Sequence, residues 1–317
     1  MRYRSDIILQ AAKLLLSGSL SYDCSIVIGD NAMGKSLLLK SVVAEKLKQE
    51  WDGIYFIDAV NRGFCAAQVS RRPERPEYIK NIMETRLEAS YFNIRDSFDC
   101  YGTLVESAER IYSAFEKKVQ DYFRELTGEQ FSICYGDVLG EVDFGDRKGL
   151  LSSGFQAMIR LLLEAVYYEE MGMARRGKQR AMMVIDELDE FLSPRYASVI
   201  LGFLRQHFPT VQFVVSTHSA DLVASAREAN VMILTAEHYE VLDAGDYATI
   251  TDAQRLFRRV FGDLPAADQQ MESELRRLFN NRLNHAWSES DEKMMEKLGQ
   301  KELTASQKLI YEQIKKW

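Results

Sequence analysis

The chain has 317 residues, of which 46% are hydrophobic and 27% are charged. This balance excludes a disordered chain and allows about two domains of roughly 150 residues each. The formal net charge of -7 argues against a protein whose whole surface binds nucleic acid, although it permits a local basic patch. The four scattered cysteines form no C-x-x-C pair, which is typical of reduced core residues, so we expect a cytoplasmic protein.

Along most of the chain, short apolar runs alternate with segments whose apolar residues recur at helical spacing. Apolar runs predict buried strands at 25–28, 53–57, 182–185, 212–216 and 231–234. Helical spacing predicts helices at 7–16, 37–49, 155–171 and 194–206, and a helical chain beyond Tyr247. Within that last region, capping-box patterns predict helix starts at Thr251 and Thr304. This alternation predicts an α/β fold with a mostly parallel sheet that helices cover on both faces. We expect no membrane-spanning segment, because the amphipathic stretch at 7–16 is too short to cross a bilayer.

Two segments depart from this pattern. Residues 71–130 are polar, charged and aromatic with helical periodicity, which predicts a helical insertion of two or three helices. Its aromatic residues either pack the insertion onto the core or form a surface for a partner. Residues 131–142 are predicted to be extended. We therefore predict a core formed by 1–70 and 131–246, an insertion at 71–130 and a helical C-terminal region at 247–317.

One run matches the phosphate-binding pattern G-x-x-x-x-G-K-[ST] without a gap. It reads Gly29-Asp30-Asn31-Ala32-Met33-Gly34-Lys35-Ser36 and lies between a predicted strand and a predicted helix. Backbone N–H groups of such a loop, together with the helix N-terminus, bind phosphate groups. Lys35 is predicted to reach the β- and γ-phosphates, and the Ser36 hydroxyl to ligate Mg²⁺. The run predicts ATP and Mg²⁺ as cofactors.

Further polar groups follow two predicted strands and precede one predicted helix. Asp186 and Glu187 follow the strand at 182–185, and we predict that Asp186 binds Mg²⁺ and that Glu187 activates water as a general base. His218 follows the strand at 212–216, where it could contact a γ-phosphate. Ser152, Ser153 and Gly154 precede an apolar helix. They form either a second anion-binding helix N-terminus or a simple helix cap.

These four elements, in this order, resemble those of the ABC-superfamily ATPases: phosphate loop, signature motif, Walker B pair and switch histidine. Asp186-Glu187-Leu188-Asp189-Glu190-Phe191-Leu192-Ser193-Pro194 and Ser216-Thr217-His218-Ser219-Ala220 are most similar to runs of the soluble, non-transporter branch. That branch holds the SMC and RecF-type ATPases, the OLD-type ATPases and the PtuA-type ATPase subunits of the Septu anti-phage system. The resemblance covers 25–57 and about 150–234.

The resemblance implies an ABC-type ATPase head that works as a homodimer or a higher homo-oligomer. Two subunits would sandwich two ATP molecules, with Ser152–Gly154 of each facing the phosphate loop of the other. Gln68 is the candidate for the glutamine that follows the second strand in these ATPases, and Asn61 and Arg62 are alternative lid residues. Ser193 stands where the family usually has an aspartate, which leaves the role of that position open.

The layout is most similar to an anti-phage ATPase that regulates a separately encoded effector, which we expect to be a nuclease. One alternative is a DNA-repair or chromosome-maintenance ATPase that binds nucleic acid directly, which basic clusters at 175–180 and 255–259 would favour. A transporter subunit is a further alternative, and so is a scaffold that binds ATP and barely hydrolyses it. The clustered acids of a metal-dependent nuclease do not follow His218.

Overall fold

The computed structural model describes residues 5–48, 53–72, 81–88, 96–100, 105–136, 138–172, 181–261, 274–275, 277–278, 287–299, 311–312 and 314–315. Within it the chain divides into two units, Met1–Val260 and Phe261–Trp317. The first unit holds the sheet and all the motifs named above.

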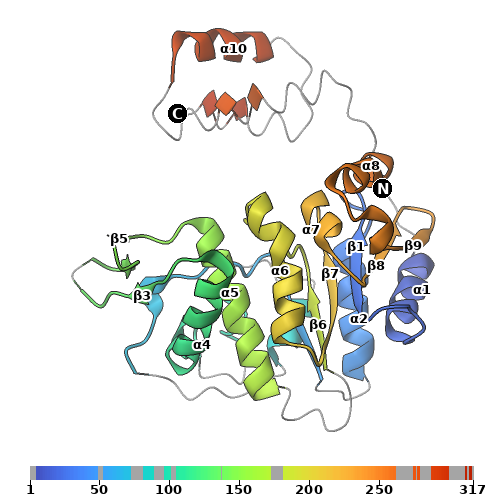
Figure 1. Cartoon of the computed structure of the whole chain (residues 1–317), viewed down its shortest axis with the longest axis horizontal. Helices are drawn as coiled ribbons and strands as arrows, with labels where there is room; N and C mark the ends of the chain where they lie inside the picture. The colour runs from blue at the N-terminus through green and yellow to red at the C-terminus, as the bar shows by residue number, and fades with distance from the viewer. Residues whose placement is uncertain are drawn as a thin grey trace. The chain divides into compact units, whose positions relative to one another are not determined.

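A six-stranded sheet forms the centre of the first unit (Figure 1). Its order is β2 (Ile54–Ile57), β6 (Ala181–Ile185), β7 (Val211–Ser216), β1 (Cys24–Ile28), β8 (Asn230–Leu234) and β9 (Tyr239–Asp243). The first five strands are parallel, and β9 pairs antiparallel with β8 at the edge. The five predicted strands and the mostly parallel sheet are confirmed. β9 was not predicted, because an edge strand with no fully buried residue lacks the apolar run that marked the others.

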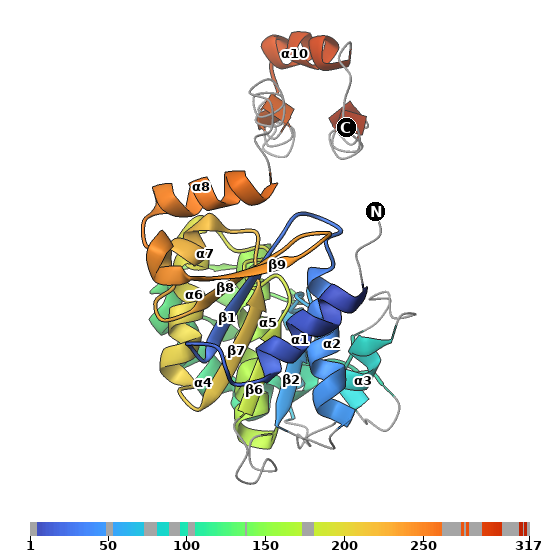
Figure 2. The ribbon, with the colours of Figure 1, turned by 90° about the vertical axis from the view of Figure 1, so that its right-hand side faces the viewer.

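Helices cover both faces of this sheet, as the buried strands require. Figure 2 shows α1 (Ser5–Leu16), α2 (Lys35–Lys48) and α3 (Asn81–Leu87) on one side. On the other side lie α4 (Glu109–Thr127), α6 (Pro194–His207) and α7 (Ala220–Ser225). α7 was not predicted, since its six residues are too few to show a helical period.

The helix predicted at 155–171 begins earlier and changes character before its end. α5 runs from Ser153 to Tyr167, and a π-helical turn follows at Tyr168–Gly172. Every residue from Ala157 to Tyr167 is buried, since α4 packs against this helix and Tyr55 of β2 contacts its Glu164 and Tyr167. In the π-helical turn, the Tyr168 ring stacks on the Tyr55 ring, with 5.3 Å between their centroids.

The predicted helical insertion contributes α3 and α4, and its apolar side chains join the same hydrophobic core as the sheet. The packing interpretation of its aromatic residues is confirmed for those the structure describes, since the following are buried: Phe98, Tyr112, Phe115 and Phe123. Tyr91, Phe92 and Tyr101 lie outside the described residues. The stretch predicted as extended forms a small antiparallel sheet of β3 (Ser132–Ile133), β4 (Val142–Asp143) and β5 (Lys148–Gly149).

After β9 the described residues are mostly helical, as predicted. α8 (Ile250–Phe261), apart from its last residue, still belongs to the first unit, since Ala253 and Leu256 join its core. We predicted a helix start at Thr251, and this was wrong. The Thr249 hydroxyl accepts a hydrogen bond from the Asp252 amide at 3.2 Å and therefore caps the helix two residues earlier. The start predicted at Thr304 and the basic cluster at 175–180 lie outside the described residues.

The second unit has a small core of its own. Apolar side chains from 274–315 pack around α10 (Glu289–Gly299): Leu275, Leu278, Met295, Leu298 and Ile314. Ile314 of the C-terminal tail is therefore buried within this unit. Of all the helices that the structure describes, none is long and apolar enough to cross a membrane.

Candidate functional site

The phosphate loop joins β1 to α2 and is held close to the neighbouring strand. A Cβ atom on Gly29 would lie 2.6 Å from the Leu234 carbonyl oxygen of β8, so only glycine fits there. Ala32 and Gly34 both have positive φ, at 63° and 95°, which turns the chain sharply before the first turn of α2. This geometry exposes the Ser36 hydroxyl at the beginning of α2.

Lys35 is buried, and its side chain folds back across this loop. The ammonium donates to the Gly29 carbonyl at 2.8 Å and lies 3.4 Å from the Asp30 carbonyl. Burial lowers the pKa of Lys35, and the nearby carboxylates, Glu187 and Asp186 foremost, oppose that shift. The lysine therefore lies between the phosphate loop and the acids of the next motif.

Asp186 follows β6 and is buried, with 4% of the residue exposed. Its amide donates to the Ile57 carbonyl of β2 at 2.9 Å, which continues the sheet pairing by one residue. The Ser216 hydroxyl, at the end of β7, donates to Asp186 Oδ1 at 2.5 Å. The carboxylate is thus fixed in direction before any ligand binds, and a buried carboxylate of this kind suits a divalent cation.

Glu187 has a φ of 52°, in the left-handed backbone region that residues other than glycine rarely adopt. Its amide donates to Ser216 Oγ at 2.8 Å, and the next amide, of Leu188, donates to the Ser216 carbonyl at 2.9 Å. The glutamate side chain remains partly exposed, with Oε1 3.8 Å from His218 Nε2. A carboxylate beside an imidazole, both open to solvent, can accept a proton from water.

His218 follows β7 and lies near both motifs. Its pKa is lowered by burial and next by the positive charge of Lys35, while Glu187 opposes the shift. The residue before it, Thr217, is buried and donates its hydroxyl to Asp189 Oδ1 at 2.5 Å. That bond ties the loop after β7 to the loop after β6.

The sheet order explains why these groups meet. β7 lies between β6 and β1, and all three strands are parallel, so their carboxyl ends share one edge of the sheet. The phosphate loop, the Asp186–Glu187 pair and His218 each follow one of these strands. Ligands of open α/β sheets bind at this edge. The buried Lys35 ammonium, the exposed Ser36 hydroxyl and the oriented Asp186 carboxylate fit a magnesium nucleotide.

The predicted signature residues lie at the N-terminus of α5. Ser152 is the helix cap, and its Oγ accepts from the Phe155 amide at 3.3 Å. Ser152 and Ser153 are exposed. A Cβ atom on Gly154 would lie 3.0 Å from the Phe191 carbonyl, so the glycine allows α5 to approach the loop after Asp186. A helix cap and an anion-binding role are compatible here, and action on a second subunit's nucleotide stays a prediction.

Gln68 lies in a short 3₁₀ helix, Ala66–Gln68, on the surface beside the start of α4. It lines a hollow of about 410 Å³ together with Glu106, Ser107 and Arg110. Its assignment to the nucleotide stays a prediction. Asn61 and Arg62, the alternative lid residues, are both buried.

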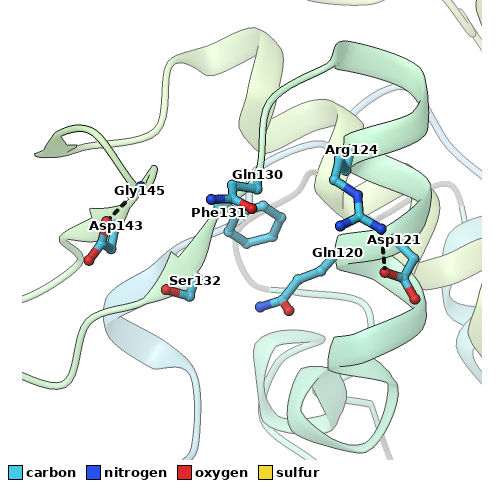
Figure 3. A pocket seen from close by; sticks show the side chains of 8 residues that line it. All are labelled: Gln120, Asp121, Arg124, Gln130, Phe131, Ser132, Asp143 and Gly145. Carbon is cyan, nitrogen blue, oxygen red and sulfur yellow. Dashed lines mark hydrogen bonds and ion pairs between the residues drawn. The ribbon is translucent and has the colours of Figure 1, made fainter.

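A second hollow, of about 340 Å³, lies between α4 and the small antiparallel sheet (Figure 3). Its charged groups are paired with their neighbours. Arg124 is 3.3 Å from Asp121, and the Asp143 carboxylate accepts from the Gly145 amide at 2.7 Å. The hollow therefore offers little unpaired charge to a ligand.

Sequence reasoning missed a buried charge cluster that joins α3, α5 and the segment at 96–97. Glu164 accepts from Arg86 at 2.8 Å and from Arg160 Nε at 2.6 Å. Arg160 also contacts Asp96, and the Tyr55 hydroxyl donates to Glu164 at 2.8 Å. One signal was present: Arg160 and Glu164 stand four residues apart on an otherwise apolar helix.

The acidic pair Glu187–Glu190 predicts how stability changes with pH. Burial and the hydrogen bond with Glu187 raise the pKa of Glu190 from 4.5 to about 7. The folded protein therefore holds this proton more tightly than the unfolded chain, and the free energy of unfolding falls as pH rises from about 4.5 to about 7. Because the pair is partly exposed, we expect a fall on the order of 1 kcal/mol.

Urea titrations at about pH 5 and about pH 8 check this expectation. Glu190→Gln should remove that part of the pH dependence, because glutamine carries no titrating proton. An unchanged pH dependence in Glu190→Gln would mean that the two carboxylates do not share a proton.

No profile of a known protein family matches the chain. Over 139 residues the chain is 25% identical to the Septu protein PtuA of Bacillus thuringiensis. This match covers 42% of this chain and 31% of that protein. The chain thus matches about a third of the length of this relative. The SMC head domain from Thermotoga maritima is 18% identical, with a TM-score of 0.31, and covers 43% of this chain and 50% of that one. An ATP-binding subunit of an ABC transporter is 14% identical, with a TM-score of 0.35. The match covers 74% of this chain and 87% of that subunit.

The motifs, their order and the similarity to PtuA all indicate the same kind of protein. The chain resembles the ABC-superfamily ATPases of the SMC-like branch, and its fold is that of a P-loop NTPase with a mostly parallel sheet.

Proposed function

We propose that the protein binds and hydrolyses ATP with Mg²⁺. The observation that carries the proposal is the meeting of the phosphate loop, the Asp186–Glu187 pair and His218 at one edge of the sheet. The proposed hydrolysis uses four motifs that lie far apart in the sequence. Three of them follow the neighbouring parallel strands β1, β6 and β7. The fourth, Ser152–Gly154, begins the helix that packs against the Phe191 carbonyl.

Each residue has a role that its surroundings support. The loop amides and Lys35 bind the β- and γ-phosphates, and Ser36 and Asp186 hold Mg²⁺. When bound, Mg²⁺ offsets the phosphate charge. Glu187 accepts a proton from the attacking water, and His218 steadies the γ-phosphate beside it.

We further propose that two copies of the chain bind head to tail around ATP, with Ser152–Gly154 acting on the nucleotide of the other copy. The exposed serines at the capped N-terminus of α5 support this, because a solvent-exposed helix N-terminus can bind anions. Opening and closing of the dimer would regulate a separately encoded effector, which we propose to be a nuclease of an anti-phage system. The similarity to the Septu protein PtuA supports that role.

Lys35→Ala tests the nucleotide site directly. Removal of the ammonium leaves the phosphate charge without its main partner, so we expect at least about 10-fold weaker binding of a fluorescent ATP analogue. Hydrolysis should fall at least as much. Lys48→Ala is the matched control, since Lys48 lies on the same helix, is 70% exposed and pairs with Glu45 within α2. Equal ATP affinity in Lys35→Ala and wild type would contradict the proposal.

A further inference from the structure

Arg62 lies in the segment after β2, and its guanidinium is buried against the Asp186–Glu187 turn. Only 3% of the residue is exposed. One nitrogen, Nη2, donates to the Asp186 carbonyl at 2.6 Å and lies 3.4 Å from the Glu187 carbonyl. A single side chain therefore contacts both carbonyls of the turn that carries the two predicted catalytic carboxylates.

That turn needs anchors, because Glu187 has a φ of 52°. A non-glycine residue keeps such a conformation only where its surroundings hold it. Ser216 holds the amide side of the turn, through the bonds from Glu187 and Leu188. Arg62 holds the carbonyl side. Together they fix the peptide planes on both sides of Glu187 and so the direction in which its side chain leaves the backbone.

The surroundings of Arg62 do not suit a purely stabilising role. Its Nε is buried without a hydrogen-bond partner, and among the described residues no carboxylate forms an ion pair with it. Burial lowers its pKa, against the more distant charges of Glu164, Asp58 and Asp186. The bonds of its guanidinium to described residues go to backbone carbonyls, and burying a charge without a paired carboxylate costs desolvation energy that an apolar side chain would avoid. By contrast, the buried Arg86 bonds directly to the Glu164 carboxylate.

We propose that Arg62 is a positioning residue for ATP hydrolysis. It acts through Glu187, by holding the left-handed turn that aims the Glu187 carboxylate toward the side of the site where His218 lies. This inference rests on the proposed function and adds a residue to it. It also replaces the lid role for Arg62, because a side chain that is buried against the turn cannot close over a ligand.

Arg62→Lys tests the inference, since lysine keeps the positive charge but lacks the planar fork of guanidinium. We expect kcat to fall by about 10- to 100-fold, because small displacements of a catalytic group have effects of this size. KM and the affinity for a fluorescent ATP analogue should stay within about 2-fold, because the phosphate-binding groups are untouched. Arg71→Lys is the matched control: Arg71 also donates to a backbone carbonyl, that of Tyr135 at 2.6 Å, away from the site.

A double-mutant cycle with Glu187→Gln separates positioning from general damage. If Arg62 acts through Glu187, Arg62→Lys should lower the residual kcat of Glu187→Gln by less than about 2-fold. A full 10- to 100-fold loss in that background would overturn the inference, and so would a wild-type kcat in Arg62→Lys. Arg62→Gln, which removes the buried charge, provides a second variant with the same expectations if the lysine variant does not fold. Wild-type protein that binds ATP without hydrolysing it would instead refute the proposed function, and with it the inference.

Discussion

Glu187→Gln is expected to lower kcat for ATP hydrolysis by about 10²–10⁴-fold, the usual contribution of a general base. Glutamine has nearly the same shape but cannot accept a proton, so the phosphate loop and the Asp186 carboxylate should bind ATP as before. The ATP-bound state would then persist. Light scattering with and without ATP and Mg²⁺ should show a mass that doubles only when both are present, because each copy supplies Ser152–Gly154 to the other.

The control for this variant is Glu228→Gln, at a side chain that is 79% exposed, lies 3.9 Å from Arg205 and precedes β8, at the opposite end of the parallel strands from the site. It should leave both kcat and mass unchanged. Undiminished hydrolysis in Glu187→Gln would remove Glu187 from the mechanism. A mass that is the same with and without ATP would show that nucleotide is not what joins the subunits, even if hydrolysis is lost.

Glu164→Gln is expected to reduce the free energy of unfolding by about 3–5 kcal/mol, the usual effect of removing one partner of a buried ion pair. Glu164 is fully buried, and Arg86 and Arg160 both donate to it. Burial alone would raise its pKa, but the two arginines outweigh that effect and hold the pKa of the carboxyl below its ordinary value. The neutral amide would leave the buried Arg86 charge without its bonded carboxylate, and Asp58 lies farther away, at 4.0 Å.

Urea unfolding of the two proteins measures this difference. Glu129→Gln is the matched control, because Glu129 makes a partly exposed pair with Arg147 at 3.8 Å and should cost less than about 1 kcal/mol. If Glu164→Gln lowers the free energy of unfolding by less than about 1 kcal/mol, the charge cluster stabilises the fold no more than apolar side chains would in its place. The cluster joins α3 to α5, so the same variant should also loosen the helical insertion from the core.

Local patterns were sufficient where one segment carries its own signal. The phosphate loop is a contiguous run whose residue types are fixed by backbone geometry, as the close approach of Gly29 to Leu234 shows. The apolar strands could be read because strands buried on both faces contain almost no polar residue. For the same reason β9 was missed, since its side chains are only partly buried.

The chemical groups, their order and the mostly parallel sheet could be predicted from the amino-acid sequence, because each depends on neighbouring residues or on short-range periodicity. Which of these groups meet depends instead on how the strands pack. The order of β6, β7 and β1 places His218 beside Glu187, and it places Ser216 on Asp186, across 30 residues of chain. The bond from Arg62 to the Asp186 carbonyl spans 124 residues. No periodicity or motif encodes such a contact, because it arises only when separate strands pack side by side.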